Sequence, residues 1–146
     1  MAFSSVHEMI DLCKESGKPL YEVILESDLA ESGLTRAESE AEMHRLWAVM
    51  QATSDGYCGA DRSMSGFAGG DAAKVNAAAA RGVLYADGYF ADVMAEALKT
   101  AECNACMKRI VAAPTAGSCG VLPAVLLPLR RRGLADEAAV HRALYI

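Results

Sequence analysis

No run of apolar residues in this sequence is long enough to cross a bilayer, although 53% of its 146 residues are hydrophobic. The longest run, residues 121–129, is interrupted by two prolines. Residues 1–5 also lack the basic region and apolar core of a secretory signal. We therefore expect a cytoplasmic protein of one domain, residues 1–146, with no membrane partner.

An excess of positive charge is missing as well. The chain has 19 acidic and 14 basic residues, a net charge of −5, which argues against nucleic acid as a partner. The one basic cluster, residues 130–132, precedes Gly133 and fits the last turn of a helix, where cations complement the dipole. The sequence contains no Walker loop and no dinucleotide fingerprint, because its Gly66-x-x-Gly69-Gly70 stretch does not follow a strand.

Alternating strand patterns are absent too, and the apolar spacing predicts an all-α chain. Ser4 or Ser5 is expected to cap a first helix that ends at Gly17, and Thr35 with Glu38 has the pattern of a capping box. The other predicted helices begin near Pro19, Asp71, Asp87, Val121 and Asp136; Asp71 is expected as an N-cap, and Pro128 is expected to kink or break its helix.

Two segments rich in glycine and hydroxyl groups separate these helices. Residues 54–70 show almost no apolar periodicity, and long loops in compact domains are often functional. Residues 111–123 run from an apolar helix end through small and hydroxylic residues into the next helix. Gly117 and Gly120 allow the backbone to approach a small anion closely, yet Thr115 and Ser118 also suit a simple helix cap. Both interpretations of this second loop stay open.

The five cysteines are expected to be thiols, because no secretory signal accompanies them. Cys103 and Cys106 share one face of a predicted helix, where they can be core residues, metal ligands or redox partners. Cys119 lies inside the second loop and is compatible with packing. We expect no metal site formed by this chain alone; Cys103, Cys106 and Cys119 are its weak candidates.

The three histidines, His7, His44 and His141, are far apart in sequence and fall on predicted helices with polar neighbours. We interpret each as a surface or boundary residue rather than a general base. The sequence ends at Leu144-Tyr145-Ile146, in the middle of an apolar pattern, so we expect more chain or a partner to pack there.

Three segments together resemble one family. Residues 113–118 read Ala-Pro-Thr-Ala-Gly-Ser and lead into a Gly-Val-Leu-Pro helix; residues 62–71 combine a basic-Ser-x-Ser-Gly segment with Gly-Gly-Asp; residues 104–107 read Asn-Ala-Cys-Met. In this order they resemble the α chain of the bacterial iron–sulfur L-serine dehydratases. The resemblance covers roughly the whole chain and implies the N-terminal half of a larger helical catalytic domain.

The resemblance implies a lyase that eliminates water from L-serine and forms pyruvate and ammonia. In the family, a [4Fe–4S] cluster binds the substrate hydroxyl as a Lewis acid, and its cysteine ligands lie in a further half that is not found here. Fixed hydroxyls and amides are suited to hold the substrate. The substrate-binding residues that follow from the match are Ser63, Ser65, Gly66, Asn104, Thr115, Ala116, Gly117 and Ser118, whereas the catalytic base stays unidentified.

Two positions depart from the family pattern. Lys108 stands where a glycine is common, and Cys106 occupies a position that is usually small, so the substrate can be another small β-hydroxy amino acid. The partners implied are the missing C-terminal half, a β chain or both, in a homo- or hetero-oligomer. The alternative interpretation is a non-catalytic fragment, truncated paralogue or assembly subunit that keeps only an anion-binding loop.

Overall fold

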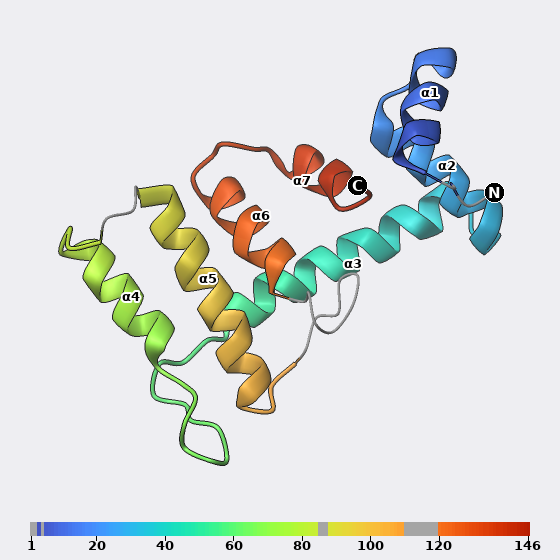
Figure 1. Ribbon diagram of the computed structural model, residues 1–146. Helices are drawn as coiled ribbons and strands as arrows, with labels where there is room; N and C mark the ends of the chain where they lie inside the picture. The colour runs from blue at the N-terminus through green and yellow to red at the C-terminus, as the bar shows by residue number, and fades with distance from the viewer. Residues whose placement is uncertain (1–2, 4, 85–87, 110–119) are drawn as a thin grey trace. The chain divides into compact units, whose positions relative to one another are not determined.

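The computed structural model describes residues 3, 5–84, 88–109 and 120–146. These residues form helices and no strands, which confirms the predicted all-α class (Figure 1). No helix among them is both long and apolar enough to cross a membrane. The helices are α1 (Val6–Ser16), α2 (Leu20–Ser32), α3 (Arg36–Asp55), α4 (Asp71–Ala80), α5 (Gly88–Ala105), α6 (Val121–Arg131) and α7 (Glu137–Ala143).

Local capping explains where the first helices begin and end. The Ser5 hydroxyl accepts a hydrogen bond from the backbone N–H of Glu8, and Gly17 ends α1 with a φ of 68°. Before α3, the Glu38 N–H donates to Thr35 Oγ1, while the Thr35 N–H donates to Glu38 Oε2. This reciprocal pair confirms the predicted capping box.

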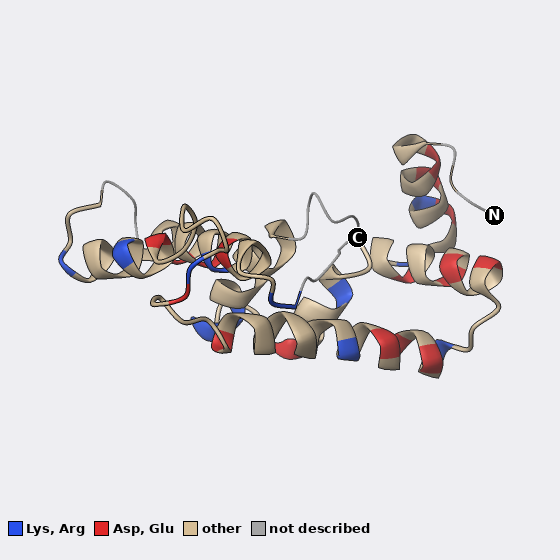
Figure 2. Cartoon of the chain, turned by 90° about the horizontal axis from the view of Figure 1, so that it is seen from below, with Lys and Arg blue, Asp and Glu red and all other residues tan. Residues whose placement is uncertain are grey.

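The chain packs as two compact units, and the first comprises residues 1–45 and 137–146. It contains α1, α2, the first half of α3, and α7. Leu25 and Val140 are each 1% exposed and form its interior with Val23. Acidic and basic side chains are interspersed along α3 (Figure 2), as expected for a helix with a solvated face.

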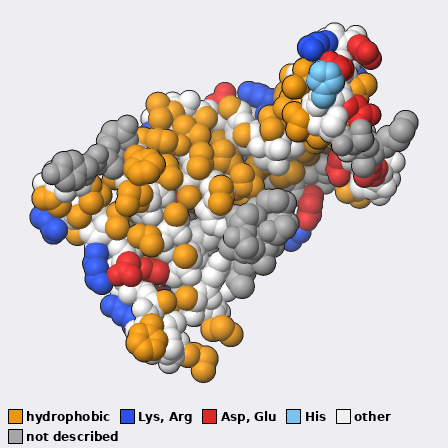
Figure 3. All heavy atoms as spheres, viewed as in Figure 1, with side chains coloured by type: hydrophobic (Ala, Val, Ile, Leu, Met, Phe, Trp, Pro, Cys, Tyr) orange, Lys and Arg blue, Asp and Glu red, His pale blue; other side chains and the backbone are white. Residues whose placement is uncertain are grey.

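The second unit, residues 46–136, contains the end of α3 together with α4, α5 and α6. Helix α5 packs against both α4 and α6 (Figure 1). The core residues of the second unit are Trp47, Met50, Ala72, Ala91, Ala95, Cys103, Ala124, Leu126 and Leu127. Hydrophobic side chains, including the exposed Phe90 and Val125, also reach the surface of this unit (Figure 3).

A buried charge cluster joins α5 to α6 and to the end of α3. Glu96 accepts hydrogen bonds from Lys99 Nζ and Arg131 Nη1, both at 2.6 Å, and from the Ser54 hydroxyl at 2.5 Å. Arg131 also pairs with Asp55 at 2.8 Å. The side chain of Glu96 is only 4% exposed, so these partners replace the water that its charge loses on burial. The sequence predicted only that Arg131 complements the dipole at the end of its helix. The structure adds the ion pairs of Arg131 with Glu96 and Asp55.

Pro128 does not break α6, which runs from Val121 to Arg131 through it. Of the two predicted alternatives, a kink or a local break, the break was wrong: the proline is buried against the rest of the unit, and Arg132 N–H still donates to the carbonyl of Pro128. Packing therefore outweighs the one backbone hydrogen bond that a proline nitrogen cannot make.

Candidate active site

The segment between α3 and α4 carries the first predicted substrate loop. The Ser63 N–H donates to the Ala68 carbonyl at 2.9 Å, and the Ala68 N–H donates to Ser63 Oγ at 3.1 Å. The hydroxyls of Ser63 and Ser65 lie 3.1 Å apart, and Gly66 turns the chain with a φ of 77°. The structure therefore brings the three predicted residues Ser63, Ser65 and Gly66 together in one closed turn.

Glu102, on the last turn of α5, fixes the start of α4. Its carboxylate accepts hydrogen bonds from the backbone N–H groups of Gly70 at 3.0 Å, Asp71 at 2.6 Å and Ala72 at 3.2 Å. It also accepts a hydrogen bond from the hydroxyl of Tyr57 at 2.7 Å. Because these are the unpaired donors of a helix N-terminus, a buried carboxylate satisfies them and complements the helix dipole.

Asp71 is therefore not the N-cap that the sequence predicted. The N-cap position is Gly70, with a φ of 86°, and the Asp71 side chain pairs instead with Lys74 at 2.7 Å on the surface. The physical reason is that the helix begins one residue earlier, where Glu102 accepts from the N–H groups of Gly70, Asp71 and Ala72. The N–H groups that an Asp71 cap would bind have other acceptors, because Ala73 donates to the Tyr57 hydroxyl and Lys74 to the Gly70 carbonyl.

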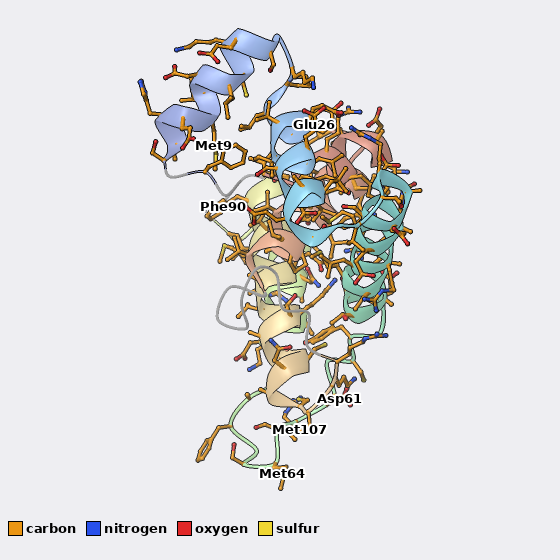
Figure 4. All side chains as sticks on the ribbon, turned by 90° about the vertical axis from the view of Figure 1, so that its right-hand side faces the viewer. Met9, Glu26, Asp61, Met64, Phe90 and Met107 are labelled. Atoms are coloured by element: carbon orange, nitrogen blue, oxygen red, sulfur yellow. The ribbon has the colours of Figure 1, made fainter. Side chains whose placement is uncertain are left out.

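A second connection ties the segment to the end of α5. Lys108 forms an ion pair with Asp61, which raises the pKa of Lys108 chiefly through the hydrogen bond between them. Figure 4 shows Asp61 and Met64 on this segment and Met107 just after α5. Lys108, the lysine that departs from the family pattern, thus has a structural partner in Asp61.

Gly69 also lies close to Asp61 within the segment. A Cβ added at Gly69 would lie 2.2 Å from the Asp61 carbonyl oxygen, so the backbone at this position leaves no room for a side chain.

The remaining described candidates lie around the same end of α5. Asn104 is half-buried on the last turn of the helix, two residues from the Glu102 anchor. Cys103 is buried, its Sγ lies 3.8 Å from the Thr53 carbonyl, and burial raises the pKa of its thiol. A small hollow here is lined by Tyr57, Cys58, Asp61, Glu102, Cys103, Cys106 and Lys108.

Two of the three candidate thiol ligands, Cys103 and Cys106, lie in the described residues at the end of α5. Within the described ranges, one group of three His, Cys, Asp or Glu side chains has its ligand atoms close enough for a single metal ion, and it contains no cysteine. Cys119 lies outside the described residues, as do Thr115, Ala116, Gly117 and Ser118 of the second loop.

The hydroxyl of Tyr57 gives a pH prediction. Burial and the hydrogen bond to Glu102 raise its pKa from 10.0 to about 12. A raised acid pKa means that the neutral phenol stabilises the fold below pH 10, and that this contribution is lost as the pH rises from about 10 to about 12. The difference in tyrosinate absorbance between the native chain and a Tyr57→Phe variant should therefore have its midpoint near 12, and near 10 in denaturant. A native midpoint near 10 would contradict the Tyr57–Glu102 contact.

The sequence of the chain matches one protein family. The family model described as serine dehydratase alpha chain matches residues 15–146. The chain belongs to the serine dehydratase alpha chain family. The match includes the turn formed by Ser63, Ser65 and Gly66, the Glu102 anchor and Asn104. No solved structure matches the chain.

Two curated relatives of the serine dehydratase chain support the same assignment. The L-serine dehydratase alpha chain of Peptoniphilus asaccharolyticus is 34% identical over 139 residues, which cover 94% of this chain and 48% of the relative. The probable L-serine dehydratase alpha chain of Bacillus subtilis (strain 168) is 30% identical over 130 residues, or 89% and 43%. The chain therefore spans about half the length of the curated relatives it matches.

Sequence reasoning missed Glu102, Tyr57 and Asp61 as parts of this site. A signal for Glu102 was present, because an acidic residue in the last turn of a helix opposes the helix dipole and needs another reason to be there. That reason lies about 30 residues away, at the start of α4, and no local pattern connects the two.

Proposed function

We propose that this chain is part of an L-serine dehydratase, in which it binds L-serine for β-elimination. The substrate loses its α-proton and its β-hydroxyl as water, and the resulting aminoacrylate hydrolyses through its imine to pyruvate and ammonia. The observation that carries this proposal is the family match over residues 15–146, which contains the paired hydroxyls of Ser63 and Ser65. The relatives are named alpha chains, so we also propose a β chain as a partner.

In this proposal the two loops hold the substrate carboxylate. The hydroxyls of Ser63 and Ser65 supply donors from a turn that its own hydrogen bonds pre-organise. Residues 115–118 supply further hydroxyl and N–H donors, and Asn104 binds the ammonium or the carboxylate through its amide. The N–H groups at the start of α4 are excluded from this role, because Glu102 already accepts from them.

We propose that the ligands of the [4Fe–4S] cluster expected for this activity lie outside the 146 residues. The surroundings of Cys103 support this, because its thiol is buried with a raised pKa, whereas a cluster ligand must be a thiolate. The roles of this chain's own residues are then limited to binding and orienting the substrate.

The test measures pyruvate formed from L-serine, without oxygen, by the complete enzyme that contains this chain. Ser65→Ala should lower kcat/KM about tenfold, because it removes one hydrogen bond to the substrate. Ser16→Ala is the matched control, and it should leave kcat/KM unchanged. Ser16 is exposed at the end of α1, where its Oγ donates to the Leu12 carbonyl and accepts from the Lys18 N–H.

Equal activity of the Ser65→Ala and Ser16→Ala enzymes would remove the first loop from the substrate site. If the complete protein forms no pyruvate from L-serine or from another β-hydroxy amino acid, the proposed reaction is wrong. The non-catalytic interpretation of the chain would then take its place.

A further inference from the structure

Two histidines that are far apart in sequence meet in the first unit. His44 lies on α3 and His141 on α7, and their ring centroids are 3.8 Å apart with the ring planes at 75°. At this distance one nitrogen atom of each imidazole can reach a shared ligand. From the sequence each histidine was predicted as a separate surface or boundary residue, so their proximity is a finding of the structure.

A carboxylate completes the group. Glu137 precedes His141 by one helical turn on α7, and its Oε1 lies 4.0 Å from His141 Nε2. One ligand atom from each of His44, Glu137 and His141 lies within 4.8 Å of the others. Two imidazoles and one carboxylate are the ligand set of many zinc sites that keep a fourth position open.

An unsatisfied nitrogen points to a missing ligand. His141 Nε2 is buried and has no hydrogen-bond partner among the described residues, and 4.0 Å is too long for a hydrogen bond to Glu137. Buried polar atoms normally have a partner, so this one asks for an explanation. A metal ion between the nitrogen and the carboxylate would satisfy both atoms.

We propose that His44, Glu137 and His141 bind one divalent transition-metal ion of the zinc class, which fastens α7 to α3. Imidazole ligands select such ions over Mg²⁺ and Ca²⁺, which prefer oxygen. Zinc–nitrogen bonds of about 2.0 Å require the three ligand atoms to move closer by roughly an ångström. His44 and Glu137 are exposed and have the room to make this movement. Water would occupy the fourth position.

The test titrates the 146-residue chain with Co²⁺, whose visible absorption reports coordination geometry, followed by displacement with Zn²⁺. We expect one Co²⁺ per chain, with the bands of nitrogen and oxygen ligands and without the charge-transfer band of a thiolate. His44→Gln and Glu137→Gln alter exposed positions, and each should weaken binding by at least about tenfold. Zn²⁺ should also raise the Tm of the unaltered chain and not that of His44→Gln.

The matched control is His7→Gln. His7 forms a similar pair with Asp11, one turn away on α1 at 3.3 Å, but belongs to no group of three ligands in the described part of the chain. Its Co²⁺ affinity should equal that of the unaltered chain. The proposal is overturned if no stoichiometric binding occurs, if His44→Gln binds as tightly as the unaltered chain, or if a thiolate band shows that cysteines hold the ion.

Discussion

Replacing Glu102 with alanine is expected to lower the free energy of unfolding of the second unit by about 3 to 4 kcal/mol. The Glu102 carboxylate accepts four hydrogen bonds, three from the start of α4 and one from Tyr57. Gly70 and Ala72 are buried, so water does not readily replace the lost acceptor. The loss therefore leaves buried N–H donors unpaired, which costs more than the net value of the bonds themselves.

The measurement is urea unfolding followed by the fluorescence of Trp47, the single tryptophan of the chain, which is 1% exposed in the same unit. Glu102→Gln keeps one amide oxygen as an acceptor and should fall between the alanine variant and the unaltered chain. Asp92→Ala is the control, because Asp92 is an acidic residue on the same helix whose side chain is 43% exposed and pairs with Arg132 on the surface. It should cost no more than about 1 kcal/mol. Equal losses for Glu102→Ala and Asp92→Ala would contradict the anchoring role.

Replacing Glu96 with alanine is expected to cost about 2 to 3 kcal/mol. Its carboxylate accepts from Arg131, Lys99 and Ser54, and Ser54 is buried with it. Removing the acid leaves two cations near each other and a buried hydroxyl with one partner fewer. The cost is smaller than at Glu102 because the Arg131 side chain is 40% exposed and water can solvate it.

The same Trp47 fluorescence measures this second effect, since Glu96 belongs to the same unit. A double-mutant cycle with Arg131→Ala isolates the interaction between the two side chains. We expect the double variant to be less destabilised than the sum of the single changes, because each single change already removes the Glu96–Arg131 contact. Additive losses would mean that Glu96 and Arg131 stabilise the unit independently.

The local parts of the fold were predictable from the sequence, and the long-range ones were not. Ser5, Gly17 and the Thr35–Glu38 pair act within one turn of the helix ends they define, so their residue types alone indicate their roles. Asp71 shows the limit of such patterns. It has the right residue type for a cap, but the helix begins one residue earlier, where Glu102, 31 residues later in the sequence, accepts from the N–H of Asp71 itself.

The candidate active site is likewise predictable in its local contacts and not in its long-range ones. Ser63, Ser65 and Gly66 are close in sequence, and the turn that holds them together is local. Their connection to α5 depends on Tyr57–Glu102 and Asp61–Lys108 contacts that span 45 and 47 residues. The meeting of His44 with His141 depends in the same way on how α7 returns to α3, which helical periodicity does not encode.

The Glu102 anchor also bears on the order in which the chain folds. Helix α4 has 10 residues, and its N-cap glycine supplies no side-chain hydrogen bond. Isolated helices of this length are marginal in water, even when they are rich in alanine. The N–H groups at the start of α4 gain their acceptor only when Glu102, about 30 residues further along the chain, packs against them. We therefore expect the turn formed by Ser63, Ser65 and Gly66, just before α4, to reach its final position late, when α5 packs against α4, and not by local nucleation.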